Sequence, residues 1–216
     1  MQIELHRVSK IISEEGILVF FSKLFRYIRK NIFGVTKTFI YELDLNDPVP
    51  KITSELDISF RLATKKDIDL MDEENYCYNE SRKKYAEERL KKGDNCALAL
   101  YNGMIIGYIW VRYDQLDTSI FNLISLSKNR VSTYNYLTLK EFRGKRVNNS
   151  MDDYINNIVR KAGKRYILAI VDKDNKASAK TRERAGYKII GYVNQLRFFG
   201  LKYDCIDKKL LSYLQK

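Results

Sequence analysis

A short basic turn between a predicted strand and a predicted helix carries the side chains with the clearest potential for chemistry. Residues 143–146 read Arg-Gly-Lys-Arg, residues 132–139 before them alternate like a strand, and residues 148–150 are polar. The first N–H groups of a helix have no acceptor within the helix and carry partial positive charge, so they attract anions. The turn therefore predicts a phosphate site, and the alternative is a basic loop that only aids solubility.

Short apolar stretches predict the strands that position this turn. We expect strands at residues 58–62, 96–101, 104–111, 132–139, 166–171, 187–193 and 196–203. Asn102 and Gly103 join the second and third of these as a type I′ turn, because both residue types tolerate positive φ. The run at 166–171 is apolar throughout, as in a central strand that is covered on both faces.

Helices are predicted between these strands. Thr64 begins one, with Asp67 placed to complete a capping box. An apolar stripe at helical spacing predicts a second helix over residues 147–162, and a third is expected over 178–185, ending at Gly186. Strands and helices in this order predict a mixed α+β fold.

The first 56 residues differ from the rest. Apolar side chains within residues 17–32 fall on one face at helical spacing, which predicts an amphipathic helix. No acid interrupts its basic residues, which are Lys23, Arg26, Arg29 and Lys30, followed by Lys37. Both prolines lie within residues 45–54, which predicts a linker. We therefore divide the chain into an N-terminal helix and linker (1–56), a main domain (57–205) and a tail (206–216).

Composition narrows the possible functions. The formal net charge of +12 favours a polyanionic or phosphate-bearing partner. No helix-turn-helix, RNA-recognition or zinc motif accompanies this charge, so nucleic acid is a disfavoured partner. Cys77, Cys96 and Cys205 are odd in number and far apart, as expected of reduced thiols in the cytoplasm. His6 is the single histidine, so we expect neither a histidine base nor a metal site in the main domain.

Taken in order, three segments resemble the GNAT acetyltransferase family. That family follows its fourth strand with Arg/Gln-x-x-Gly-x-Gly/Ala, where the turn and helix N-terminus hold the pyrophosphate of coenzyme A. The matching residues here are 143–148, preceded by Phe142. Residues 175–187, which contain Asn-x-x-Ser and Ala-Gly-Tyr, are similar to the segment after the family's fifth strand. The hairpin with Ile106-Gly107 is similar to its second and third strands.

The resemblance implies a single mixed, mostly antiparallel sheet flanked by helices, with acetyl-CoA as cosubstrate and no metal. It places the cofactor along the fourth strand, at the basic turn and at the loop after the fifth strand. The implied cofactor-binding residues are Tyr136, Leu137, Thr138, Arg143, Gly144, Lys145, Arg146, Val147, Asn148, Asn149 and Asn175. Ser178 is expected to cap the helix that follows Asn175.

Three residues depart from the family pattern. Arg146 and Asn148 replace small residues of the pyrophosphate turn. Their side chains either crowd the phosphate or, at Arg146, add a charge-assisted contact. Arg182 stands where many members place a tyrosine that protonates the departing thiolate, and arginine cannot donate a proton at neutral pH. The proton donor is therefore another residue or water.

The general base cannot be assigned from the resemblance. An amine must lose a proton before it attacks a thioester. Glu141, Asp114 and Glu73 lie near the expected site, but each reads equally well as a surface acid. Tyr134 and Tyr136 are two residues apart on one strand, so we expect them on the same face, either toward substrate or in packing.

The expected function is transfer of an acetyl or other acyl group from acyl-CoA to a small-molecule or peptide amine. The alternative is a non-catalytic module that kept the fold and binds coenzyme A or a partner. We expect the protein in the cytoplasm, because its longest apolar run near the start, residues 17–21, is too short to cross a bilayer. The N-terminal helix can pack on its own domain, bind a partner or lie on an anionic membrane.

Overall fold

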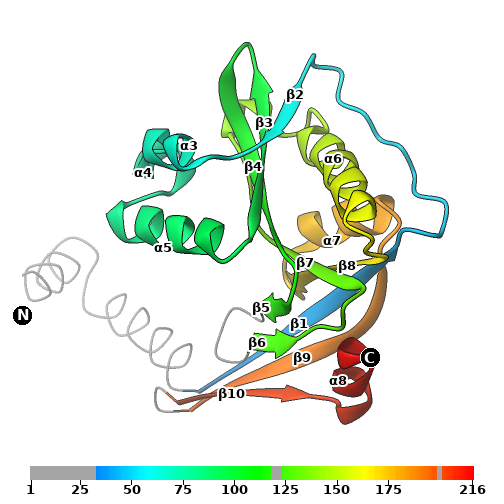
Figure 1. Ribbon diagram of the computed structural model, residues 1–216. Helices are drawn as coiled ribbons and strands as arrows, with labels where there is room; N and C mark the ends of the chain where they lie inside the picture. The colour runs from blue at the N-terminus through cyan, green and yellow to red at the C-terminus, as the bar shows by residue number, and fades with distance from the viewer. Residues whose placement is uncertain (1–32, 118–122, 199–200) are drawn as a thin grey trace, which may run out of the picture.

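The computed structural model describes residues 33–117, 123–198 and 201–216 (Figure 1). Its strands are β1 (Phe33–Asp44), β2 (Ser59–Leu62), β3 (Asn95–Tyr101), β4 (Met104–Arg112), β5 (Gln115–Asp117), β6 (Leu123–Ser125), β7 (Arg130–Thr138), β8 (Tyr166–Asp172), β9 (Lys188–Phe198) and β10 (Leu201–Ile206). Its helices are α3 (Lys65–Leu70), α4 (Glu73–Tyr76), α5 (Glu80–Lys91), α6 (Val147–Lys161), α7 (Lys176–Arg184) and α8 (Lys208–Gln215), with a 3₁₀ turn at Lys140–Phe142. The N-terminal helix expected within residues 17–32 lies outside the described residues.

One mixed sheet forms the centre of the molecule. Its eight strands run in the order β10-β9-β1-β8-β7-β4-β3-β2. All neighbours are antiparallel except β7 and β8, which are parallel. β5 and β6 pair separately as a small two-stranded sheet. The predicted α+β class with a mixed, mostly antiparallel sheet is confirmed.

Helices cover both faces of the sheet. α3, α4 and α5 lie on one side of β3 and β4, whereas α6 and α7 lie on the other (Figure 1). The predicted stripe of α6 is buried through Val147, Met151, Ile155 and Val159. Trp110 of β4 is fully buried in the cluster under α3–α5. Within the described part of the chain, no helix combines the length and the apolar character needed to cross a bilayer.

Several local predictions are confirmed. Asn102 and Gly103 have φ values of 50° and 80°, as a type I′ turn between β3 and β4 requires. Thr64 and Asp67 form the expected capping box at the start of α3. The third predicted helix begins at Lys176, two residues earlier than expected, and ends before Gly186, whose φ is 89°.

The N-terminal boundary of the main domain differs from the expected one. β1 precedes the proline-containing segment, yet it pairs with β8 on one side and β9 on the other. It is a central strand of the sheet, so residues 33–44 cannot be separated from the domain that we placed at 57–205. The sequence did not reveal this, because its pairing partners lie more than a hundred residues later in the chain.

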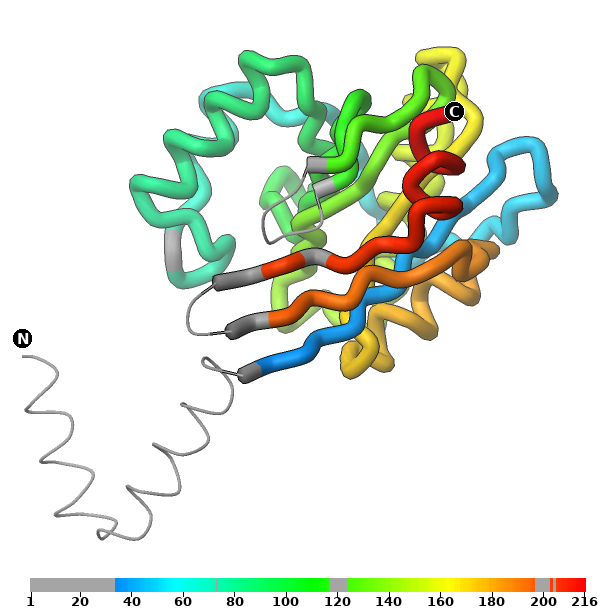
Figure 2. The backbone as a smooth tube through the Cα atoms, turned by 90° about the horizontal axis from the view of Figure 1, so that it is seen from below, coloured from blue at the N-terminus to red at the C-terminus, as the bar shows by residue number. Residues whose placement is uncertain are grey.

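The C-terminal end also belongs to the core. Figure 2 shows β1, β9 and β10 side by side, with α8 following β10. α8, in the residues that we treated as a tail, buries Leu210 and Leu214 together with Ile40 and Leu168. The predicted break between strands at 187–193 and 196–203 is in the wrong place. β9 runs unbroken from Lys188 to Phe198, and the next strand, β10, begins at Leu201.

Candidate functional site

The parallel strands β7 and β8 pair over only part of their length. Their register runs from Arg130 beside Tyr166 to Thr133 beside Ala169. β7 then continues to Thr138, and no further pairing joins it to β8 within the described strands. The strands therefore separate after Thr133, and one edge of β7 is left without strand partners.

A β-bulge lies where the strands separate. Asn135 has φ of 48°, and the register between β4 and β7 shifts at this point. Tyr134 stacks on Trp110 at a centroid distance of 6.2 Å, on the side of α5. The Tyr136 hydroxyl instead accepts a hydrogen bond of 3.0 Å from Arg182 Nη1, on the side of α7. The expectation that both tyrosines share a face is therefore wrong, because a bulge inserts one residue and breaks the alternation.

The basic turn joins the end of β7 to α6. Gly144 and Arg146 have φ values of 78° and 60°, so the turn contains two left-handed residues. α6 starts at Val147 without a side-chain cap and without an acid in its first turn. Because the first helical bond is from Ser150 N to Arg146 O, the amides of residues 147–149 lack acceptors within the helix. This geometry suits an anion.

Side chains hold the turn in place from both sides. Arg143 Nε donates to Thr138 O at 3.1 Å. The Thr138 hydroxyl donates to Asn148 Oδ1 at 2.7 Å. Ser54, from the proline-containing segment, donates through its hydroxyl to Lys145 O at 2.7 Å. Asn148, one of the departures from the family pattern, therefore links the helix to the strand.

A hollow of about 470 Å³ lies beside the start of α6. Its walls come from the proline-containing segment, the turn, α6 and α7, and they consist of Lys51, Ile52, Thr53, Arg146, Asn149, Thr181 and Arg184. Three of these residues are cationic and none is acidic. Sequence reasoning identified Arg146 and Asn149, but it missed Lys51 and Arg184, which lie in other segments of the chain.

The loop after β8 ends at the start of α7. Asn175 is the N-cap of this helix, and its Oδ1 accepts from Ser178 N at 3.1 Å. The cap is therefore Asn175, not Ser178 as expected, because the residue that precedes the first turn is the one placed to accept from it. Asn175 is exposed and is not among the residues that line the hollow beside α6.

A buried ion pair explains the arginine that replaces the family's tyrosine. The side chains of Arg182 on α7 and Asp152 on α6 are each 4% exposed and lie 2.9 Å apart. Tyr136 adds its hydroxyl to this pair, so the cluster joins β7, α6 and α7. Burial raises the pKa of Tyr136, so the phenol stays protonated at neutral pH. Arg182 therefore supports the site structurally and donates no proton.

A second hollow, of about 370 Å³, lies on the opposite side of β7. It is lined by residues of α5, the segment before it, β4 and the bulge, namely Cys77, Tyr78, Arg82, Tyr85, Arg89, Tyr108, Asn135, Tyr136 and Leu137. None of these residues is acidic. Sequence reasoning missed this wall, although Arg82, Tyr85 and Arg89 are spaced as i, i+3 and i+7, which places them on one face of a helix.

The predicted bases do not gather at either hollow. Glu141 is exposed in the 3₁₀ turn, and Asp114 is exposed just after β4. Neither residue lines the hollow beside α6 or the hollow beside α5. Glu73 opens α4, but its side chain lies outside the described residues.

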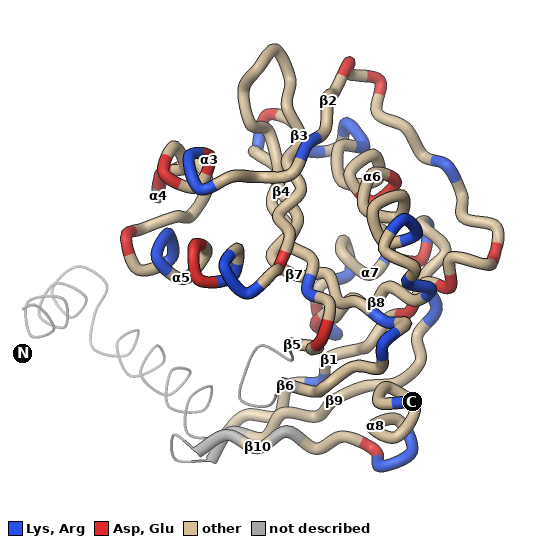
Figure 3. The backbone as a smooth tube through the Cα atoms, viewed as in Figure 1, with Lys and Arg blue, Asp and Glu red and all other residues tan. Residues whose placement is uncertain are grey.

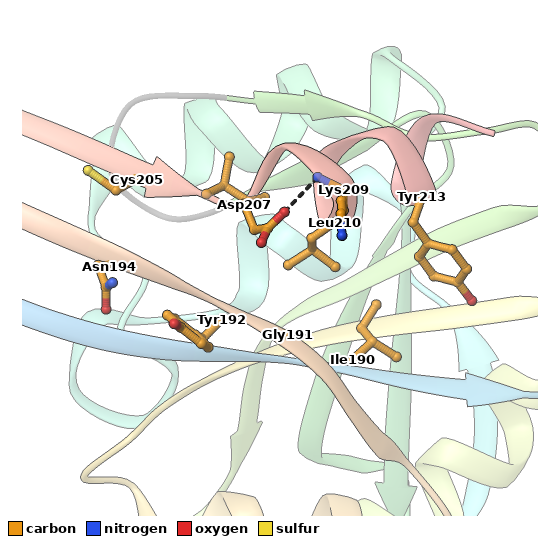
Figure 4. A pocket seen from close by; sticks show the side chains of 10 residues that line it. Ile190, Gly191, Tyr192, Asn194, Cys205, Asp207, Lys209, Leu210 and Tyr213 are labelled. Atoms are coloured by element: carbon orange, nitrogen blue, oxygen red, sulfur yellow. Dashed lines mark hydrogen bonds between the residues drawn. The ribbon is translucent and has the colours of Figure 1, made fainter.

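A wider hollow, of about 790 Å³, lies at the other end of the sheet between β9, β10 and α8 (Figure 4). Leu210 lies directly over Gly191, where an added Cβ would come within 2.3 Å of Leu210 Cδ2. None of the residues that line this hollow belongs to β7 or to the basic turn. The candidate site is therefore the region around β7.

Sequence comparisons find no relative. No family model matches the chain, and no curated protein matches it. Solved structures do match. A GNAT acetyltransferase from Colwellia psychrerythraea aligns with a TM-score of 0.58 at 11% identity, covering 82% of this chain and 61% of that chain.

Two other solved structures match in the same way. A tandem GNAT protein from the clavulanic acid biosynthesis pathway gives a TM-score of 0.54 at 13% identity, covering 87% of this chain and 59% of that one. A GCN5-related N-acetyltransferase from Sphaerobacter thermophilus gives 0.54 at 13% identity, covering 85% and 56%. The chain thus spans somewhat more than half the length of each of these three proteins. These similarities, together with the observed strand order, show that the chain has the GNAT acetyltransferase fold.

Proposed function

We propose that this protein is an acyl-CoA-dependent N-acyltransferase that transfers an acetyl or other acyl group to an amine. The observation that carries the proposal is the path of β7. This strand separates from β8, contains a bulge and leads directly into a basic turn with free helix N–H groups. An extended amide-containing arm that ends in a pyrophosphate fits such a path, because free strand edges bind amides and helix N-termini bind phosphates.

The residues of this chain would divide the binding between them. The free edge of β7 at Tyr136, Leu137 and Thr138 supplies backbone groups for the pantetheine arm. The amides of residues 147–149 supply donors for the pyrophosphate, and Arg146 adds a fork of charged donors. Lys51 and Arg184 line the hollow beside α6 and would bind a further phosphate.

Transfer proceeds by direct attack of the neutral amine on the thioester carbonyl. The C–N bond forms, the C–S bond breaks, and the thiolate of coenzyme A leaves. Backbone N–H groups at the bulge would stabilise the charge that develops on the carbonyl oxygen. The proton that the amine nitrogen loses passes to water, since none of the described residues that line the hollow beside α5 is a carboxylate.

Calorimetric titration of the full chain with acetyl-CoA tests this proposal. Replacing Gly144 with Glu adds a negative charge and a side chain at a φ of 78°, and it should abolish binding. Gly163→Glu is the matched control. Gly163 also has positive φ, 69°, and like Gly144 it has no atom within 4 Å of an added Cβ, but it lies at the far end of α6. Unchanged affinity in Gly144→Glu would contradict the proposal.

A non-catalytic module that binds coenzyme A is the second candidate. It is favoured by the acid-free hollow beside α5 and by the use of Arg182 in a structural ion pair. Thiol release from acetyl-CoA in the presence of an amine panel separates the two candidates. Release above the rate without amine supports the enzyme, whereas tight binding of coenzyme A without release by any amine supports the module.

A further inference from the structure

The hollow beside α5 is positively charged. Two of its lining residues are arginines and none is acidic. Acids do occur on α5, where they are interleaved with basic residues (Figure 3). Glu80 lies 3.9 Å from Lys83, and Glu87 lies 3.2 Å from Lys65, so these two acids have cationic partners outside the hollow.

Arg89 is a buried cation that has no carboxylate partner among the residues that the structure describes. It is 7% exposed, and its Nε has no hydrogen-bond partner among the described residues. Its guanidinium lies 3.9 Å from the ring centroid of Tyr85 and 4.6 Å from that of Tyr134. Aromatic faces stabilise a cation, but they leave its in-plane N–H groups without acceptors.

Other buried arginines of the protein are paired. Arg112 lies 3.0 Å from Asp94, Arg130 lies 3.4 Å from Glu42, and Arg182 lies 2.9 Å from Asp152. A buried charge without a partner is costly, so a site that keeps one is suited to an incoming opposite charge. Arg89 lines a hollow, where such a charge can reach it.

Arg82 provides a second cation, seven residues or about two turns nearer the start of α5. Its Nη1 donates to Cys77 O at 2.7 Å, which restrains the guanidinium beside the hollow that Arg82 and Cys77 line. The side chain is exposed, and its remaining donors are available to a ligand. Two guanidinium forks on one helix face match the oxygens of a carboxylate or a phosphate.

Resting on the proposed function, we propose that the amine acceptor carries an anionic group, a carboxylate or a phosphate, that binds Arg82 and Arg89 while its amine faces the bulge in β7. The same hollow supplies both Asn135–Leu137 and the two arginines, so one small molecule can reach both. The arginines also favour the neutral form of a nearby amine, because like charges disfavour the ammonium. That effect favours the neutral, nucleophilic amine where the described lining residues include no carboxylate.

Matched amine pairs test this inference. Thiol release is measured with the full chain and saturating acetyl-CoA for glucosamine 6-phosphate against glucosamine, and for phenylalanine against phenylalaninamide. The first pair tests a phosphate and the second a carboxylate. In at least one pair we expect kcat/KM to be about 10- to 100-fold higher for the anionic member, the scale of hydrogen bonds to charged groups.

Variants connect this preference to the hollow. Arg82→Gln should reduce the ratio within the preferred pair at least fivefold, and this exposed residue can be replaced without loss of the core. Lys84→Gln removes a charge from the same helix but outside the hollow, and it should leave the ratio unchanged. The inference is overturned if coenzyme A binds and neither pair favours its anionic member, or if Arg82→Gln leaves the ratio intact. Failure of acetyl-CoA to bind at all would instead overturn the proposed function.

Discussion

A buried arginine lies on each side of β7, and the two arginines differ in whether a carboxylate neutralises them. On the side of α6 and α7, Arg182 is neutralised by Asp152 and hydrogen-bonded to Tyr136. On the side of α5, Arg89 lies between the rings of Tyr85 and Tyr134 and forms no ion pair with any acid in the described part of the chain. The first arrangement fixes three elements relative to one another. The second leaves a cation available to bind an anionic ligand. One side of β7 therefore stabilises the fold, and the other side is the one that we propose binds the acceptor.

The largest effect is expected from Arg182→Met. Removing the cation leaves Asp152 buried without a partner, which should lower the free energy of unfolding by about 3–5 kcal/mol. Urea denaturation measures this loss. Burial raises the pKa of Asp152 in the folded state, and without Arg182 it is raised further. The folded variant then binds a proton that the unfolded chain releases, so its stability should fall as pH rises above about 4. A loss below 1 kcal/mol at pH 7 would show that the pair does not support the site.

A smaller effect is expected from Arg146→Gly in the basic turn. Glycine adopts the φ of 60° at this position without strain, and this relief offsets its greater freedom in the unfolded chain. Stability should therefore stay within about 0.5 kcal/mol of wild type, while acetyl-CoA binding weakens by about 1–2 kcal/mol. Calorimetry and thermal unfolding on the same samples check both values. If the variant binds acetyl-CoA as tightly as wild type, Arg146 does not contact the cofactor.

Asn175 and Ser178 form a matched pair at the start of α7. Asn175→Ala removes the cap and should cost about 1 kcal/mol of stability. Ser178→Ala should cost less than about 0.5 kcal/mol, since Ser178 takes part in the cap only through its backbone N–H. Thermal unfolding of both variants measures the difference, and equal losses would refute the assignment of the cap.

Only a small net effect on stability is expected from Arg89→Met. Methionine fills the space between Tyr85 and Tyr134 without a buried charge, so the loss of cation–π contact is offset by the removal of an unpaired cation. The free energy of unfolding should stay within about 1 kcal/mol of wild type. A loss comparable to that of Arg182→Met would remove the distinction between the two faces of β7.

Local patterns predicted the strand, turn and helix around which the candidate site is proposed. The alternation of β7, the basic turn and the stripe of α6 are continuous in sequence, and the structure joins them in that order. The walls contributed by Lys51, Arg184, Arg82 and Arg89 were missed, because they come from three separate segments. Arg82 and Arg89 share a helical spacing that is visible in the sequence, but nothing in the sequence indicated that this face of α5 lies beside β7.

The sequence by itself determined the elements whose causes are local. Asn102-Gly103 fixed a hairpin, the capping box at Thr64 began α3, and the apolar stripe after the basic turn defined α6. Tertiary structure alone decided that β1 enters the sheet between β8 and β9, and that a bulge at Asn135 turns neighbouring tyrosines to opposite faces. Pairings of this kind depend on which distant strands and side chains meet, and such contacts are set by the packing of the whole core.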